Sequence, residues 1–183
     1  MEAAAALFVA HGIEATTVDD IVDRARVSKG TFYHYFDTKN DVILALRERF
    51  TRTFGARVAE AIERCSPDDL IGRLHGWIAA SVDTYLDDYQ LHDVVFHDFT
   101  HAHRQPKEKD VVVDQLADLL AEGNRAGTWS VGEVRAASIV MFDGMHGLVD
   151  EAIASGQPDR ARLRQTLSDL FLRMIGAAPT SQK

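Results

Sequence analysis

The chain has 183 residues, of which 46% are hydrophobic and 26% charged, so length and composition favour one compact globular domain with a small annex. The formal net charge of −8 argues against a general affinity for nucleic acid. A single cysteine, Cys65, excludes an intramolecular disulfide and a metal site of several cysteines. With no apolar run long enough to span a membrane and no basic, signal-like start, we expect a cytoplasmic protein.

Apolar residues in the first third of the chain recur at helical spacing. A first helix over residues 2–11 should end before Gly12, and Thr17 should cap a second helix. A tight turn then leads to a short, polar helix over residues 28–35. Thr38 is the expected cap of a long helix whose apolar residues recur every four positions, for about six turns.

The remainder of the chain is also helical in pattern. Ser66 and the proline after it should open a helix, and a separate helix is expected over residues 91–103. Ser130 and Glu133 have the spacing of a capping box at the start of a later helix. The other predicted helices run from 107 to 125 and from Pro158 to Met174. These segments predict an all-α fold of about nine helices.

The second and third predicted helices carry the clearest functional signal. Val27, Phe32 and Phe36 can anchor the short helix from below, which leaves a polar face exposed. That face carries Lys29, Thr31, Tyr33 and His34. Four basic residues and one acid lie between positions 24 and 39, although the whole chain is acidic. An apolar underside and an exposed row of donors are typical of a recognition helix that enters the DNA major groove.

In this segment the chain resembles the TetR family of one-component bacterial regulators. The resemblance rests on the set Leu7, Phe8, Gly12, Thr16, Thr17, Val18, Ile21, residues 27–36 and Lys39. It implies a helix-turn-helix at 17–36 within a DNA-binding domain of residues 1–50. A ligand-binding and dimerisation domain over 51–178 and a disordered tail at 179–183 should follow. Family members usually carry basic residues ahead of the first helix, whereas this chain begins inside it.

The resemblance also implies a role for each polar residue of the motif. Thr17 should face a phosphate with its hydroxyl and with the N-terminus of its helix. Ser28, Lys29 and Thr31 should enter the major groove, where Lys29 is best placed to meet guanine acceptors. Contacts to the phosphate backbone should come from Tyr33, His34 and Lys39.

A single recognition helix reads only a few base pairs, so the resemblance implies a homodimer on a palindromic operator. The last two helices are the expected dimer interface, although the same faces could pack inside the chain. The predicted interface residues are Met141, Gly144, Met145, Leu148, Leu167, Leu170, Phe171 and Met174. The predicted function is a transcriptional repressor released from DNA by a small apolar or amphipathic effector. An activator and a ligand-insensitive architectural DNA-binding protein are the alternatives.

Aromatic residues are more frequent in the middle helices than one inner face requires. They could form solid core, or they could line an effector pocket with few polar groups. The candidates for this pocket are Trp77, Tyr85, Tyr89, Phe96, His97, Phe99 and Phe142.

Histidines also gather in the middle helices. His97 and His101 share a helix face with Asp93, one turn earlier, and this set could hold zinc or a similar divalent ion. The same side chains could instead line the pocket, or lie at the surface or in the core. A metal-responsive regulator or metal-binding protein is therefore an alternative function. Otherwise the sequence predicts no cofactor, and its motifs do not indicate an enzyme.

Overall fold

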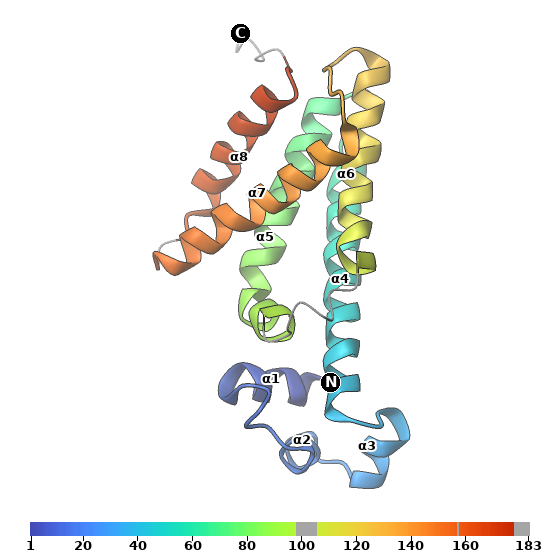
Figure 1. The fold of residues 1–183 in the computed structure, drawn as a ribbon, viewed down its shortest axis with the longest axis vertical. Coiled ribbons are helices and arrows are strands. Elements are labelled where there is room, and N and C mark those ends of the chain that lie inside the picture. Colours follow the sequence, from blue (N-terminus) through green and yellow to red (C-terminus); the bar gives the residue numbers. More distant parts are fainter. Residues whose placement is uncertain (98–105, 157, 178–183) are drawn as a thin grey trace. The chain divides into compact units, whose positions relative to one another are not determined.

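The structure of the chain is a computed structural model that describes residues 1–97, 106–156 and 158–177, with the side chains at 97 and 106–110 outside the description. These residues form eight α-helices and no strand (Figure 1). The helices are α1 (Glu2–His11), α2 (Val18–Ala25), α3 (Lys29–Tyr35), α4 (Lys39–Glu63), α5 (Leu70–His97), α6 (Pro106–Ala126), α7 (Val134–Ala154) and α8 (Arg160–Met174). The all-α prediction is confirmed. Helix α5 is interrupted at Asp88, which leaves the helical conformation (φ −126°, ψ 20°). This kink separates two helical segments three residues before the predicted start of a new helix at Leu91.

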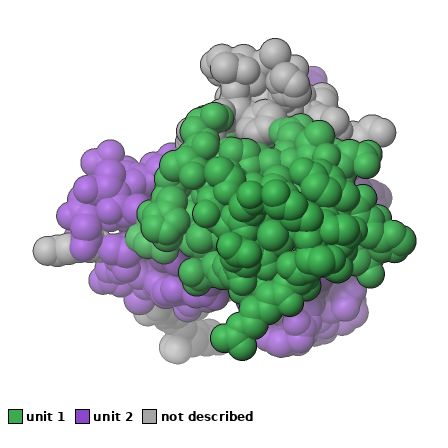
Figure 2. Space-filling model, turned by 90° about the horizontal axis from the view of Figure 1, so that it is seen from below, with its two compact units in different colours: residues 1–53, 88–106 green, residues 54–87, 107–183 purple. Residues whose placement is uncertain are grey.

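The described residues divide into two compact units, which Figure 2 shows in different colours. The first unit comprises Met1–Thr53 and Asp88–Pro106, and the second comprises Phe54–Asp87 and Lys107–Lys183. Helices α4 and α5 each contribute residues to both units, and α5 is divided at its bend. The sequence predicts a boundary after residue 50, with all of the later chain in the second domain. Membership of the last turns of α5 in the first unit is therefore a feature of the tertiary structure.

The core of the first unit joins α1 to α3 with the first half of α4 and the end of α5. Phe8, Leu46 and Val95 are fully buried in it. Arg47 is also buried: its guanidinium donates to the backbone carbonyl of Val95 and lies 5.2 Å from the centre of the Phe96 ring. A buried cation is stable only with such partners, so this contact holds the end of α5 against α4.

Local signals start and stop the helices of the first unit as expected. Gly12 ends α1 with a φ of 82°, a conformation that a side chain would disfavour. Thr17 caps α2 and completes a capping box with Asp20. At the start of α4, the backbone N–H of Asp41 donates to Thr38 Oγ1 (3.3 Å) and that of Thr38 donates to the Asp41 carboxylate (2.7 Å).

Two predicted helix starts in the second unit are wrong. Helix α5 begins at Leu70 rather than at Ser66, because the Asp69 carboxylate accepts the N–H of Gly72 (2.8 Å) and so acts as the cap. The predicted box of Ser130 does not form either. The N–H of Ser130 instead donates to the carbonyl of Ile175 at 3.3 Å, and α7 begins four residues later. A long-range contact thus replaces the local one.

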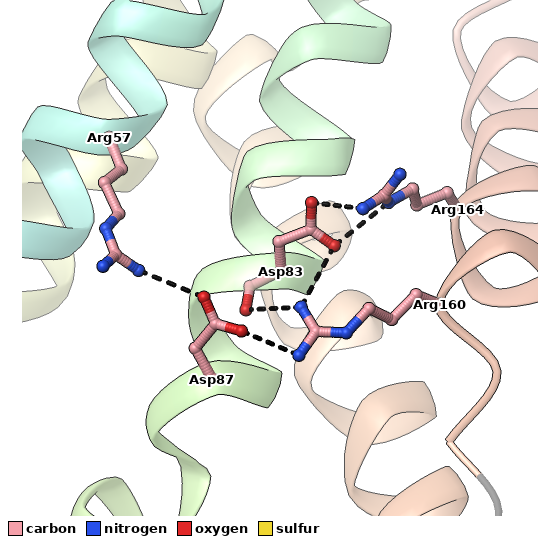
Figure 3. Close-up of polar contacts among 5 residues, drawn as sticks. All are labelled: Arg57, Asp83, Asp87, Arg160 and Arg164. Atoms are coloured by element: carbon pink, nitrogen blue, oxygen red, sulfur yellow. Dashed lines mark hydrogen bonds and ion pairs between the residues drawn. The ribbon is translucent and has the colours of Figure 1, made fainter.

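An ion-pair network connects α4, α5 and α8 within the second unit (Figure 3). Asp83 accepts hydrogen bonds from both Arg164 and Arg160, and Asp87 accepts from Arg160 at 2.7 Å. Arg57 reaches Asp87 from α4 at 3.4 Å. The hydrogen bond that Arg160 donates to Asp87, followed by the charges of both carboxylates, raises the pKa of Arg160. The network fixes the start of α8 against α5.

No helix in the described ranges is both long enough and apolar enough to cross a membrane.

Candidate nucleic-acid interface

Helix α3 has only seven residues and is held by a cap at its start and by phenylalanine side chains that pack into the core. At its start the N–H of Thr31 donates to Ser28 Oγ (3.1 Å), which caps the helix. Phe32 is buried in the core of the first unit, and Phe36 packs against that core. Val27 was predicted as a third anchor, but it is 42% exposed. It lies in the turn that closes α2, where its N–H donates to a carbonyl of that helix rather than its side chain entering the core.

The polar face of α3 is exposed as predicted. Its exposed side chains are Ser28, Lys29, Thr31, Tyr33 and His34. Tyr35 is not among the predicted contact residues, but it is 72% exposed and lies one turn beyond Thr31 on the same side of the helix. That four-residue spacing was the signal that could have identified it. The exposed face therefore offers two tyrosines, a lysine, a histidine and two hydroxyls.

Gly30 lies in the middle of this face, between Lys29 and Thr31. Its φ is not positive, and a Cβ added there would meet only Ser28 Oγ, at 3.6 Å. The fold therefore does not require glycine at this position, where alanine would favour the helix. The missing side chain leaves room for a ligand to approach the backbone of α3.

The lysine of the exposed face, Lys29, forms an ion pair within the chain. Lys29 Nζ lies 2.7 Å from Asp19 Oδ1 on α2, and both side chains are about 60% exposed. The hydrogen bond to Asp19 and its charge raise the pKa of Lys29. An anionic ligand of α3 must therefore compete with Asp19 for the ammonium group.

Thr17 also uses its hydroxyl within the chain. Its Oγ1 accepts the N–H of Asp20 (3.1 Å), and its hydroxyl donates to the Asp20 carboxylate (2.6 Å). These hydrogen bonds from the Thr17 side chain and backbone lower the pKa of Asp20. The predicted contact of Thr17 with a phosphate would therefore need the hydroxyl to leave Asp20, or would be made by the backbone N–H groups of α2.

Lys39 connects the start of α4 to the loop between α1 and α2. Its Nζ donates to the carbonyls of Ile13 (2.5 Å) and Thr16 (2.9 Å). An ammonium group has three donors, so these two bonds leave one for the predicted phosphate contact. In the structure this lysine positions the helix-turn-helix.

Comparison with known proteins agrees with this geometry. The profile of the bacterial regulatory proteins of the tetR family matches residues 1–46. The transcriptional regulator QacR of Staphylococcus aureus is 23% identical over 173 residues, which cover 91% of this chain and 90% of QacR. The chain belongs to the TetR family. It is a DNA-binding transcriptional regulator with α2 and α3 as its helix-turn-helix.

Other members share either part of the sequence or the whole fold. The transcriptional repressor KstR2 of Mycobacterium tuberculosis is 32% identical over 98 residues, which are 54% of this chain and 48% of KstR2. A TetR-family regulatory protein from Rhodococcus RHA1 has the same fold, with a TM-score of 0.77 and 21% identity. That match covers 97% of this chain and 95% of the Rhodococcus chain. The family fold therefore extends over both units.

The metal-responsive alternative has no support from these relatives. His101 and the side chain of His97 lie outside the described residues. Within the described ranges, no group of three or more histidine, cysteine, aspartate or glutamate side chains could hold a metal ion.

The predicted pocket residues are divided between the two units. Trp77 and Tyr85 are fully buried in the second unit, and Phe142 is half-buried there. The Tyr85 hydroxyl donates to Asp150 on α7 (2.6 Å), and its ring centre lies 4.8 Å from that of His146. These residues of α5 and α7 are in contact.

Tyr89 and Phe96, by contrast, belong to the first unit. The Phe96 ring stacks on His92 at 4.8 Å and lies 5.7 Å from Phe50. Phe96 thus helps to hold the end of α5 against α4. Phe99 lies outside the described residues.

The predicted dimer residues separate into buried and exposed groups. Met141, Met145, Leu167 and Phe171 are buried in the chain's own core, so their side chains are removed from the predicted interface. Leu148 is half-buried and Gly144 is exposed. Leu170 and Met174 are 48% and 46% exposed, and Val140, which was not predicted, is 57% exposed. The exposed apolar surface of α7 and α8 is therefore smaller than expected and partly different.

Proposed function

We propose that the chain is a repressor that binds a palindromic operator as a homodimer and is released by a small-molecule effector. The observation that carries this proposal is the exposed, capped face of α3 on a buried phenylalanine anchor. An anchored helix with an exposed row of polar side chains meets the requirement for reading base edges in the major groove. The similarity to KstR2, which is described as a transcriptional repressor, supports repression rather than activation.

Each residue of the face has a proposed contact. Lys29, Thr31 and Ser28 meet base edges, with Lys29 exchanging Asp19 for guanine acceptors. Tyr33 and His34 contact phosphates and set the register of the helix on the duplex. Thr17 and Lys39 contribute phosphate contacts with the N-terminus of α2 and with the remaining ammonium donor.

A second copy of the chain would cover the exposed apolar side chains of α7 and α8. Val140, Leu170 and Met174 lie on helices that contact each other in one chain. Large apolar side chains on neighbouring helices are typical of an interface between subunits. A dimer through these residues would present two copies of α3 to the two half-sites of a palindrome.

The effector would act through helices that belong to both units. Since α4 and α5 run from one unit into the other, a shift of either helix in the second unit is transmitted along the chain to the first. Effector binding and operator binding then oppose each other by a single coupling free energy. Trp77, Tyr85 and Phe142 are the proposed pocket residues within the second unit.

The first experiment is a fluorescence-anisotropy titration against DNA from upstream of the gene, with selection from a genomic library if that DNA fails. We expect Lys29→Ala to weaken specific binding by about 5- to 160-fold, because a base contact is worth about 1–3 kcal/mol and about 1.4 kcal/mol is a factor of ten. Arg64→Ala is the matched control, since it removes one exposed positive charge from the second unit. Equal losses of affinity in the two variants would contradict base reading by α3. The sign of regulation is tested with a reporter gene: lower reporter expression in a strain that lacks this protein would contradict repression.

A further inference from the structure

The chain has two tryptophans, and their indole N–H groups are in different situations. Both are buried in the second unit, with Trp77 at 0% and Trp129 at 4% exposure. Trp129 Nε1 donates to the carbonyl of Leu120 at 2.8 Å. Among the described residues, Trp77 Nε1 has no hydrogen-bond partner. An indole nitrogen can only donate, so Trp77 requires an acceptor that the described protein does not supply.

The next turn of α5 carries a second such atom. Ser81 is fully buried, and its Oγ has no partner within the described ranges. A helical serine commonly donates to the carbonyl four residues earlier, and Ser138 does so on α7, to Val134 at 2.9 Å. Ser81 does not make the corresponding bond. The third unpartnered atom, Gln115 Oε1, lies on α6 in an amide whose nitrogen already donates to the Gly55 carbonyl (3.1 Å).

Trp77 and Ser81 share one side of α5, because they are four residues apart. Tyr85 follows at the same spacing and contacts α7 through Asp150 and His146. The row therefore faces the interior of the second unit. Two buried polar atoms without partners in adjacent turns are costly, and a partner supplied by a bound molecule would remove that cost.

We propose that Trp77 Nε1 and Ser81 Oγ are the polar end of the effector site, and that the effector is a neutral, mostly apolar molecule with a carbonyl-type acceptor. This inference rests on the proposed function. Arg47 is the only buried charged residue in the described ranges, and it belongs to the first unit. A carboxylate or an ammonium ligand would therefore lack a buried counter-charge in the second unit. The fully buried neighbours along the chain, Leu74 and Ile78, suit an apolar body.

The unpartnered state can be tested without any ligand. Trp77→Phe and Trp129→Phe both remove a buried indole, so the two losses of packing are comparable. Only Trp129→Phe also removes a hydrogen bond. We expect the melting temperature of Trp129→Phe to fall about 2–4 °C further than that of Trp77→Phe. Ser81→Ala should leave it unchanged or raised, whereas Ser138→Ala should lower it. If the members of each pair behave alike, the polar atoms of Trp77 and Ser81 are satisfied in the free protein, and the inference is wrong.

The ligand class is tested with methyl ketones from 2-hexanone to 2-dodecanone and with the matching 2-methyl-1-alkenes. Each pair has the same shape, but only the ketone accepts a hydrogen bond. Binding is followed by thermal shift and, in the Trp129→Phe protein, by fluorescence of Trp77 alone. We expect at least one ketone to bind the protein about tenfold more tightly than its matching alkene. In Ser81→Ala and Trp77→Phe, the ratio of the ketone and alkene affinities should fall below about twofold.

Operator binding is measured on the same preparations. If the protein binds operator DNA but binds no ketone, or binds ketone and alkene equally, the proposed effector class is wrong and the proposed function is unaffected. A ketone preference in a protein that binds no DNA supports the polar site and contradicts the proposed function instead.

Discussion

The polar contacts of the two units differ in the distance along the chain that they join. In the first unit, the pairs Thr17–Asp20, Ser28–Thr31 and Thr38–Asp41 each join residues three positions apart. In the second unit, Tyr85 is 65 residues from Asp150, and Asp83 is 81 residues from Arg164. The exposed face of α3 is therefore shaped by local contacts, whereas the helices of the second unit are also joined by long-range ones.

The first unit has long-range polar contacts too, but they serve another purpose. Lys39 bonds to Ile13, 26 residues away, and Arg47 bonds to Val95, 48 residues away. Lys39 joins the start of α4 to the loop before α2, and Arg47 joins α4 to the end of α5. Both contacts join helices of the first unit, and neither involves the exposed residues of α3.

The largest expected effect separates the two sides of α3. Phe32→Ala should lower the free energy of unfolding by about 3 kcal/mol and abolish operator binding, because it removes the anchor of a short helix. Tyr35→Ala, on the exposed side, should change stability by less than about 0.5 kcal/mol while weakening operator binding. Urea denaturation followed by circular dichroism measures the free energy of unfolding of both variants, and fluorescence anisotropy measures their operator binding. A stability loss in Tyr35→Ala as large as in Phe32→Ala would show that the face is not free.

The next effect tests the long-range network of the second unit. Asp83→Asn should cost about 1–2 kcal/mol, since it removes the charge shared by Arg160 and Arg164 but all three side chains are partly exposed. The control is Glu60→Gln, which breaks a pair with Arg64 four residues away on one exposed helix. That change should cost less than about 0.5 kcal/mol. Equal costs in denaturant titrations at low salt would mean that the network adds nothing beyond surface pairs.

A smaller effect is expected on DNA affinity. Asp19→Asn frees the Lys29 ammonium and removes a negative charge next to the proposed DNA surface, so binding should tighten about threefold at low salt. Asp114→Asn makes the same change of charge on α6, where Asp114 pairs with Arg135, and should leave affinity nearly unchanged. Anisotropy titrations that give the same gain for both variants would assign the effect to net charge alone.

The smallest effect is a pH dependence in the cap of α2. Hydrogen bonds from Thr17 lower the pKa of Asp20 below its ordinary value of 3.8, so the cap stabilises the fold fully above pH 3.8. This contribution is lost as the pH falls through the lower, folded-state pKa. The stability difference between the wild type and Asp20→Asn should therefore be present at neutral pH and close below pH 3.8. A difference that persisted unchanged in acid would mean that the carboxylate charge has no part in the cap.

Local reasoning predicted most of the first unit because its signals act within one helical turn. Gly12, Thr17 and Thr38 each decide a helix end through their own conformation or a contact three residues away. The same reasoning failed at Ser130, which has the correct spacing to Glu133 but donates its N–H to Ile175 instead. A local motif predicts structure only where no distant group competes for the same atoms.

The all-α class, the helix-turn-helix and the exposed residues of α3 follow from the amino-acid sequence, since helical periodicity and caps need only near neighbours. Tertiary structure decided that α5 bends at Asp88 and ends in the first unit. It also decided that Met141 is buried while Val140 is exposed, and that Trp77 lacks the acceptor that Trp129 has. These outcomes depend on which residues from distant segments pack around each side chain, and the periodicity of a single helix does not specify them.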